Sequence, residues 1–255
     1  MSTFHELHST LLILPNAWDA GSARLFEHAG ARAIATTSAG MAWSLGYPDG
    51  YKLPVDEVLH SAALIRAAVK IPVSIDIENG YADDPSELAL KLIALGIAGI
   101  NIEDGSEPPA ILARKIEAIK TAASKRGYEL FINARCDVYL RNLVPDHLPE
   151  SIARGKLYRE AGADGFFVPG IKVPDQIRAV VDAIPLPVNV LATAGLPDGA
   201  ALSALGVRRL SAGSAIAQLM NVESEQRARA FLATGSSDAF ARAMPYGELQ
   251  KLFVR

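Results

Sequence analysis

The stretch LGIAGINIED, residues 95–104, contains the pattern that decides the fold. Gly96 stands where a helix should end, because glycine is the commonest residue just past the last helical turn. The apolar run that follows has the length and composition of a short buried strand, and it ends in two carboxylates. The same order of a small or leucine residue, a glycine and a strand-like run recurs in AGARAIATTS (29–38), AGADGFFVPG (161–170) and LGVRRLSAGS (205–214).

Four further apolar runs extend this pattern to the rest of the chain. Two of them are entered through proline, KIPVSIDIE (70–78) and PLPVNVLA (185–192), and the others are LLILPNAWD (11–19) and ELFINARCD (129–137). Most of the gaps between runs predict helices, for example at 86–95, 110–125 and 148–161. Near-continuous apolar strands that alternate with helices indicate a parallel sheet covered on its outer face.

Eight such units in a chain of 255 residues predict an α/β fold, a (β/α)8 TIM-type barrel with extra C-terminal helices. A doubly wound sheet fits less well, because no glycine-rich phosphate-binding motif follows the first strand. We therefore expect residues 1–255 to form a single barrel domain, with residues 215–255 as a C-terminal helical segment.

The composition is that of an ordinary globular protein, with 50% hydrophobic and 21% charged residues. A net charge of −3 argues against a nucleic-acid-binding surface. The single cysteine, Cys136, rules out an internal disulfide and suits a reducing compartment. The first ten residues lack an apolar signal core, and no apolar run reaches the ~18 residues of a membrane span. We expect a cytoplasmic protein with no membrane association.

Charged side chains gather where the predicted strands end. In PVSIDIENGYADD (72–84), Asp76 and Glu78 are two residues apart on a strand, so they should share one face. An isolated Asp-x-Glu is more often a solvated strand end, but in a barrel the carboxyl ends of all strands meet at the active-site face. Glu103 would join them from the next strand, and Arg135 from the one after. Clustered carboxylates without a nearby histidine favour Mg²⁺, or Mn²⁺, over zinc.

The motifs that contain these residues resemble the isocitrate lyase and phosphoenolpyruvate mutase superfamily, from about residue 12 to residue 214. The resemblance implies that Asp76 binds Mg²⁺ directly, that Glu78 stands at the neighbouring acid, and that Glu103 acts largely through metal-bound water. Asp49 would match the acid that supports the metal's water shell, and it is one of two residues that we expect to act in catalysis. The matching motifs, in the family's order, are TTSAGMAWSLGYPDG (36–50), DIENGY (76–81), GINIEDG (99–105) and NARCD (133–137).

The same resemblance also assigns a substrate site. The backbone of Ser38, Ala39 and Gly40 would hold the substrate carboxylate. Arg135 would bind the same ligand and is the second residue that we expect to act in catalysis. Trp43, in the loop after the second strand, would wall the pocket, with packing of that loop as an equal alternative.

A metal ion beside an arginine suits the enolate of pyruvate, because negative charge develops on the keto oxygen when a bond to C3 breaks. The superfamily's isocitrate-type lyases and its phosphonate mutases carry their characteristic motifs in the loop after the fourth strand, whereas here only residues 105–109 precede the next helix. We therefore expect a Mg²⁺-dependent lyase or decarboxylase that cleaves a C–C bond of a small 2-oxo or 2-hydroxy carboxylic acid through an enolpyruvate-type intermediate. The alternatives are a phosphonomutase or C–P bond enzyme acting on phosphonopyruvate-like substrates, and a non-catalytic 2-oxo acid binding protein.

The segment AIAQLMNVESEQRARAFLATG (215–235) predicts a helix that ends at a glycine. Members of the superfamily typically form tetramers in which pairs of subunits exchange their last barrel helix. The resemblance therefore implies a homo-oligomer, a dimer or a tetramer, with residues 215–255 as the candidate exchanged segment.

Overall fold

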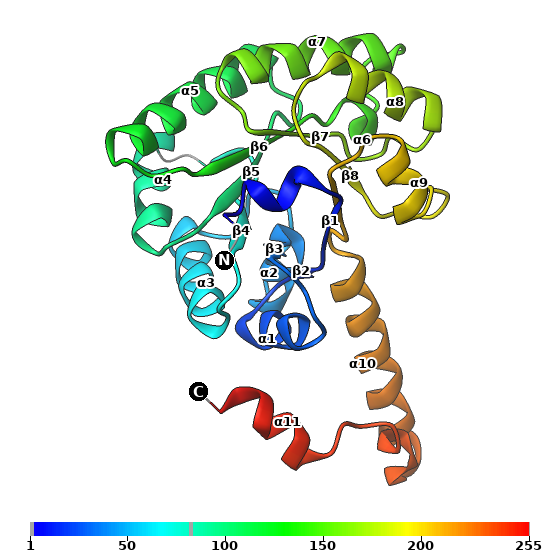
Figure 1. The fold of residues 1–255 in the computed structure, drawn as a ribbon. Helices are drawn as coiled ribbons and strands as arrows, with labels where there is room; N and C mark the ends of the chain where they lie inside the picture. Colours follow the sequence, from blue (N-terminus) through cyan, green and yellow to red (C-terminus); the bar gives the residue numbers. More distant parts are fainter. Residues whose placement is uncertain (1–2, 82–83, 255) are drawn as a thin grey trace.

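The computed structural model describes residues 3–81 and 84–254, and it confirms the predicted barrel (Figure 1). Within these residues, nine parallel strand segments form one sheet in the order β1-β9-β8-β7-β6-β5-β4-β3-β2. The segments are β1 (Leu12–Leu14), β2 (Asn16–Ala17), β3 (Ile34–Thr36), β4 (Val73–Asp76), β5 (Gly99–Glu103), β6 (Phe131–Arg135), β7 (Gly165–Phe167), β8 (Val188–Leu191) and β9 (Arg209–Ser211).

The ninth segment exists because the first predicted strand is split in two. Pro15 lies between β1 and β2, and proline has no backbone N–H to donate to a neighbouring strand. β1 pairs in parallel with β9, and β2 pairs in parallel with β3. The two halves of one strand therefore close the sheet into the eight-unit barrel that the sequence predicts.

Helices connect the strands and cover the outside of the barrel (Figure 1). The helices predicted at 86–95, 110–125 and 148–161 are α4, α5 and α7, and their ends agree to within one residue. The helices of the barrel are α1 (Ala20–His28), α2 (Ser38–Ser44), α3 (Val55–Ala68), α4 (Pro85–Ala94), α5 (Pro109–Lys125), α6 (Val138–Arg141), α7 (His147–Glu160), α8 (Pro174–Ala183) and α9 (Gly199–Ala204).

The glycine of each repeated stretch has a left-handed backbone. The φ angles of Gly30, Gly96, Gly162 and Gly206 are 95°, 74°, 101° and 88°. Residues other than glycine rarely adopt these angles, because their Cβ atom then approaches the backbone. The repeat in the sequence is thus a repeat of one helix-to-strand turn, and each turn starts a strand of the barrel.

Apolar side chains close the amino-terminal end of the barrel. A 3₁₀ helix, η1 (Glu6–Ser9), carries Leu7 into this end, and Phe4 precedes it. They pack with Leu12 and Phe131, the first residues of β1 and β6. Since this end is filled, the opposite end, where the strands finish, is the one available to a ligand.

The chain continues beyond the barrel as two further helices, α10 (Ala215–Thr234) and α11 (Tyr246–Phe253), with a 3₁₀ turn, η2 (Ser237–Phe240), between them. Gly235, with φ 67°, ends α10 as predicted. Figure 1 shows α10 projecting from the barrel and α11 returning towards α1. The Nε of Arg24 in α1 donates to the carbonyl oxygen of Leu252 in α11 at 2.6 Å. In the part of the chain that the structure describes, no helix has both the length and the apolar composition to cross a membrane.

Candidate active site

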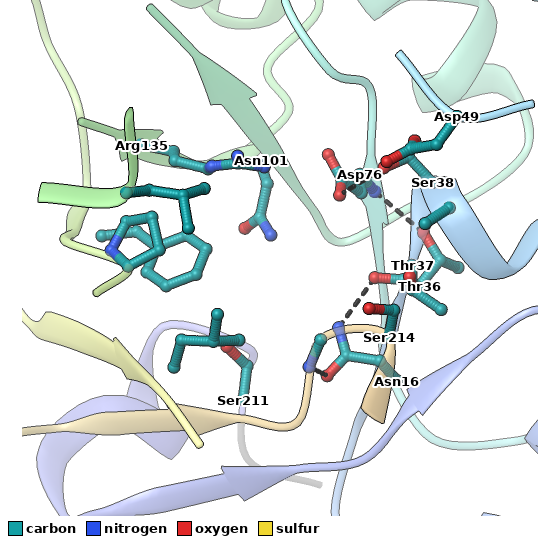
Figure 2. A pocket seen from close by; sticks show the side chains of 16 residues that line it. Asn16, Thr36, Thr37, Ser38, Asp49, Asp76, Asn101, Arg135, Ser211 and Ser214 are labelled. Carbon is teal, nitrogen blue, oxygen red and sulfur yellow. Dashed lines mark hydrogen bonds between the residues drawn. The ribbon is translucent and has the colours of Figure 1, made fainter. Parts of the chain in front are cut away.

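A cavity of about 220 Å³ lies among the carboxyl ends of the barrel strands. Figure 2 shows Arg135 on one side of it, with Asp76, Ser38 and Asp49 on the other. Pockets for drug-sized ligands have roughly 300–1,000 Å³. The smaller space here suits a ligand of only a few carbon atoms.

Asp76 is the last residue of β4 and lines the cavity (Figure 2). Its Oδ1 accepts a hydrogen bond from the backbone N–H of Glu78 at 3.1 Å, and its Oδ2 accepts one from Ser38 Oγ at 3.1 Å. The backbone N–H of Asp76 donates to Thr36 Oγ1 at 2.8 Å. Burial raises the pKa of Asp76, and the positive charge of Arg135 opposes that rise. Both oxygens are therefore oriented, as a ligand to a hard cation requires.

Glu78 is not among the residues that line the cavity. β4 ends at Asp76, and Glu78 has a left-handed φ of 51°, so the strand alternation that predicted a shared face does not extend to it. Its Oε2 instead accepts a hydrogen bond from the backbone N–H of Tyr51, and its Oε1 accepts one from the Tyr81 hydroxyl at 3.4 Å. Burial and, second, the negative charge of Asp76 raise the pKa of Glu78 to about 7.

Glu103, the last residue of β5, lies in a hydrogen-bonded group. Arg135 Nη1 is 2.5 Å from its Oε2, and the Tyr51 hydroxyl donates to its Oε1 at 2.7 Å. Arg141 Nη2 lies 3.5 Å from the same Oε1. Burial raises the pKa of Glu103 to about 7, although the charge of Arg135 opposes this. Tyr51 and Arg141 were not predicted, because no local pattern connects them to the end of β5.

Arg135 ends β6 and lines the cavity. Asp137 orients it, since Nε donates to Oδ1 at 2.6 Å and Nη2 donates to Oδ2 at 3.1 Å. Nη1 forms an ion pair with Glu103 Oε2. Asp137 takes two of the five N–H groups of the guanidinium, so the other N–H of Nη2 and those of Nη1 remain for Glu103 and a ligand. Burial opposes the charge, but Glu103 and Asp137 outweigh it and raise the pKa of Arg135.

The structure brings only some of the predicted carboxylate-binding residues to the cavity. Ser38 and Ala39, at the start of α2, line it. Gly40 does not, and its N–H donates to Thr37 Oγ1 at 3.3 Å. A Cβ on Gly40 would lie 2.7 Å from Thr37 Cγ2, so packing alone accounts for the glycine. Trp43 is 36% exposed and is not a lining residue either.

The acids fit a metal that takes few protein ligands. Within residues 3–81 and 84–254, no group of three or more His, Cys, Asp or Glu side chains is placed to hold an ion together. Asp76 and Asp49 line the cavity, whereas Glu103 pairs with Arg135. Mg²⁺ keeps several of its waters and is usually bound through one or two carboxylates. An oriented Asp76 with Asp49 beside the same space is such a donor set.

Two asparagines with no predicted role also line the cavity, Asn16 and Asn101. Asn16 Nδ2 donates to the carbonyl oxygen of Thr36 at 2.8 Å, and its Oδ1 accepts from the backbone N–H groups of Ala212 and Gly213 at 2.9 Å each. It thereby ties the first strand to the loop after the last, and its place just after a strand run was the available signal. Asn101 lies within β5, where strand alternation can place it on the same face as Glu103 but gives no sign of its partners.

The chain matches a known protein family over most of its length. The family profile described as phosphoenolpyruvate phosphomutase matches residues 4–232. Protein Rv1998c of Mycobacterium tuberculosis (strain H37Rv), described as uncharacterized, is 40% identical over 258 residues, which cover 99% of this chain and 96% of that protein. A crystal structure from Burkholderia cenocepacia J2315, provisionally described as a lyase/mutase, has a TM-score of 0.90 and 36% identity, and the match covers 99% of this chain and 95% of that chain.

Two other relatives carry the names of reactions. The 2-methylisocitrate lyase of Bacillus subtilis (strain 168) is 28% identical over 201 residues, which are 72% of this chain and 64% of that enzyme. An oxaloacetate decarboxylase of Pseudomonas syringae pv. tomato is 29% identical over 176 residues, which are 64% of this chain and 60% of that enzyme. Both names describe enzymes that act on small carboxylic acids.

Proposed function

Because the chain belongs to the phosphoenolpyruvate phosphomutase family, in the isocitrate lyase and phosphoenolpyruvate mutase superfamily of lyases and mutases, we propose that it is a Mg²⁺-dependent carbon–carbon lyase or decarboxylase. Its substrate is a small 2-oxo or 2-hydroxy carboxylic acid. The observation that carries this proposal is the small cavity in which Asp76 and an oriented Arg135 lie on opposite sides (Figure 2).

The donors of the chain fit Mg²⁺ as the resident metal. Asp76 would hold the ion directly, and Ser38 Oγ, which donates to Asp76 Oδ2 at 3.1 Å, keeps that carboxylate oriented. Asp49, Glu78 and Glu103 would hold its water shell. When bound, Mg²⁺ supplies positive charge where an enolate develops from the substrate's keto group. Mn²⁺ accepts the same oxygen donors.

Arg135 would bind the substrate carboxylate. Its terminal N–H groups that Asp137 does not take can form parallel hydrogen bonds to one carboxylate, and Asp137 keeps the guanidinium plane in place. Leu140, Phe167 and Pro169 line the cavity with apolar surface. Because an apolar wall lowers the local dielectric constant, it strengthens the attraction between Arg135 and a developing negative charge.

The connection after β5 favours C–C cleavage over transfer of a phosphoryl group. β5 ends at Glu103 and α5 begins at Pro109, so only residues 104–108, DGSEP, connect them. A transferring phosphoryl group needs cationic partners, and this connection carries two acids and no Lys or Arg. A C–P bond enzyme acting on phosphonopyruvate-like substrates is the second candidate, and a non-catalytic 2-oxo acid binding protein is the third.

A substrate panel tests the three candidates. The purified protein with Mg²⁺ is incubated with oxaloacetate, 2-methylisocitrate, dimethylmalate or phosphonopyruvate, and pyruvate and phosphorus-containing products are followed by NMR. We expect pyruvate from at least one of the first three substrates, and none from Asp76→Asn. Turnover of phosphonopyruvate alone would favour the C–P candidate. Oxalate binding without any turnover would favour the binding protein.

We also propose that the chain forms a homo-oligomer through its C-terminal segment. α10 extends away from the barrel (Figure 1), and Leu219 and Leu232 on it are 64% and 82% exposed. Burying a leucine side chain contributes about 1.5–3 kcal/mol, so a second copy packed on this helix would be favoured. Light scattering should give the mass of a dimer or tetramer, and a monomer mass at micromolar concentration would contradict the proposal.

A further inference from the structure

Beneath the cavity, the barrel interior holds a buried arginine. Arg209, in β9, is 1% exposed and is not a lining residue. It precedes Ser211 by two positions on the same strand, and Ser211 lines the cavity. Residues two apart on a strand share a face, so Arg209 projects into the barrel one layer nearer its filled end.

Arg209 is bonded to a residue that does line the cavity. Its Nη2 donates to Asn101 Oδ1 at 3.2 Å. Among the residues that the structure describes, no group accepts a hydrogen bond from Arg209 Nε or Nη1. Burial lowers the pKa of Arg209 to about 9, which Asp76 opposes, so the guanidinium is charged at neutral pH.

This contact determines which way the Asn101 amide faces. A guanidinium has donors and no acceptor, so Asn101 must turn its oxygen towards Arg209. Asn133 Nδ2 donates to the same Oδ1 at 2.9 Å and also to Asn189 Oδ1 at 3.0 Å. Asn189 Nδ2 in turn lies 3.2 Å from Ser211 Oγ. The usual ambiguity between the nitrogen and oxygen of an amide is thus resolved by a charged donor.

The nitrogen of Asn101 is consequently left for the cavity. In the described part of the chain, no group accepts a hydrogen bond from Asn101 Nδ2, and Asn101 lines the cavity (Figure 2). In the strand register Asn101 is the β5 partner of Asp76, so both project into the barrel at the same level. A ligand held near Asp76 would therefore lie within reach of this N–H donor.

We propose that Asn101 is a substrate-binding residue whose Nδ2 donates a hydrogen bond to an oxygen of the 2-oxo acid, and that Arg209 is a positioning residue that fixes its orientation. This inference rests on the proposed function and deepens it. Because Asn101 Nδ2 is a neutral donor, it selects a ligand that has an acceptor oxygen next to it. The buried charge of Arg209 polarises the Asn101 amide, so Arg209 acts on the ligand through Asn101.

Titration calorimetry with oxalate and Mg²⁺ tests the role of Asn101. Oxalate presents two planar carboxylates, as the enolate of pyruvate presents its keto oxygen and carboxylate. Asn101→Leu removes the donor without adding charge and should weaken oxalate binding roughly tenfold, with Mg²⁺ binding retained. Asn101→Asp keeps an acceptor for Arg209, so it should fold even if Asn101→Leu does not, and it should bind oxalate more weakly still.

A double-mutant cycle tests whether Arg209 acts through Asn101. Arg209→Met should weaken oxalate binding by roughly three- to tenfold in the native background and should have no further effect in Asn101→Leu. Arg209→Lys, which keeps a charged donor, should restore most of the affinity. Equal losses from Arg209→Met in both backgrounds would overturn its positioning role.

The outcomes separate this inference from the proposed function. If the native protein binds oxalate with Mg²⁺ and both Asn101 variants bind it equally well, the substrate-binding role of Asn101 is wrong and the proposed function stands. If the native protein does not bind oxalate with Mg²⁺, the proposed site fails, and the role of Asn101 fails with it.

Discussion

Glu103 and Asp104 are consecutive acids at the end of β5, but their carboxylates meet different parts of the molecule. Glu103 pairs with Arg135, which lines the cavity. Asp104 is fully buried, and its Oδ2 accepts hydrogen bonds from Arg154 Nη1 at 2.8 Å and from the Tyr158 hydroxyl at 2.6 Å. Both of these partners belong to α7, outside the barrel wall.

The difference between the two ion pairs lies in what remains unused. The second oxygen of Asp104 accepts from the backbone N–H of Asp137 at 2.8 Å, so this carboxylate is satisfied within the protein. Arg135, in contrast, lines the cavity and keeps N–H groups that Asp137 does not take. The pair of Asp104 with Arg154, which we call the wall pair, joins a helix to the sheet. The pair of Glu103 with Arg135, the cavity pair, leaves a cation available to a ligand. Three predictions test this division and a fourth extends it to the filled end of the barrel, from the largest expected effect to the smallest.

Asp104→Asn should destabilise the fold strongly. The variant keeps the shape of the side chain but leaves Arg154, with a side chain 9% exposed, without its buried anion. Breaking a buried pair by removing one partner costs about 3–5 kcal/mol, and urea unfolding measures this loss. The matched control is Glu150→Gln, which removes the other anion of Arg154, 35% exposed, and should cost no more than about 1 kcal/mol. Equal small losses would mean that the wall pair is not a structural anchor.

Asp76→Asn should instead affect the metal and spare the fold. Loss of the direct ligand should weaken Mg²⁺ binding at least a hundredfold, or about 2.7 kcal/mol, as measured by calorimetry. The free energy of unfolding should change little. Asp76→Asn removes a buried negative charge that lies near the carboxylate of Glu78, and this offsets the weaker hydrogen bonds of the asparagine. Glu103→Gln, the control, should weaken Mg²⁺ binding less, because an intervening water can reorganise. Unchanged Mg²⁺ affinity in folded Asp76→Asn would mean that Asp76 and Glu78 are only a solvated strand end.

Arg135→Lys should separate ligand binding from metal binding. Lysine cannot form the two parallel hydrogen bonds of a guanidinium, so oxalate affinity should fall about tenfold, or about 1.4 kcal/mol, with Mg²⁺ affinity largely retained. Arg141→Lys is the matched control, since Arg141 also contacts Glu103 and Asp137 but does not line the cavity. An equal effect of the two changes on oxalate binding would make Arg135 a structural residue.

His8 extends the comparison to the filled end of the barrel. Its Nδ1 lies 2.9 Å from the carbonyl oxygen of Phe4, and burial lowers the pKa of His8 to about 3. The folded pKa is below the unfolded value of 6.5, so the unfolded chain binds more protons between these values. Stability should therefore fall as the pH drops below 6.5, by up to about 1.4 kcal/mol per pH unit.

The variant His8→Asn isolates this contribution, because asparagine keeps an N–H group for Phe4 and does not titrate. Between pH 7 and pH 5.5 the native protein should lose about 1 kcal/mol more stability than the variant. Urea unfolding at the two pH values measures the difference. Parallel losses would show that the pKa of His8 is not lowered in the folded protein.

Local signals in the sequence were enough to predict the barrel and part of the site. The glycines of the repeat predicted the helix-to-strand turns, because their backbone preference depends on no distant partner. Cys136 follows Arg135 directly, so strand alternation turns it away from the barrel interior, and it is fully buried in the hydrophobic core, where burial raises its pKa to about 12. Asp76 and Arg135 reached one cavity because barrel topology brings all strand ends to one face.

Only the tertiary structure decided which groups those side chains meet. Asn101 meets Arg209 from 108 residues away, Glu103 meets the Tyr51 hydroxyl from 52, and Asp104 meets Arg154 from 50. A sequence pattern can place a polar side chain inside the barrel, since the period of a strand is local. The partner of that side chain depends on the register of all the strands and on where the loops cross, and these are set only when the sheet closes. For the same reason, the sequence located the strand ends, while the closed barrel determined which of their acids face a ligand and which hold the wall together.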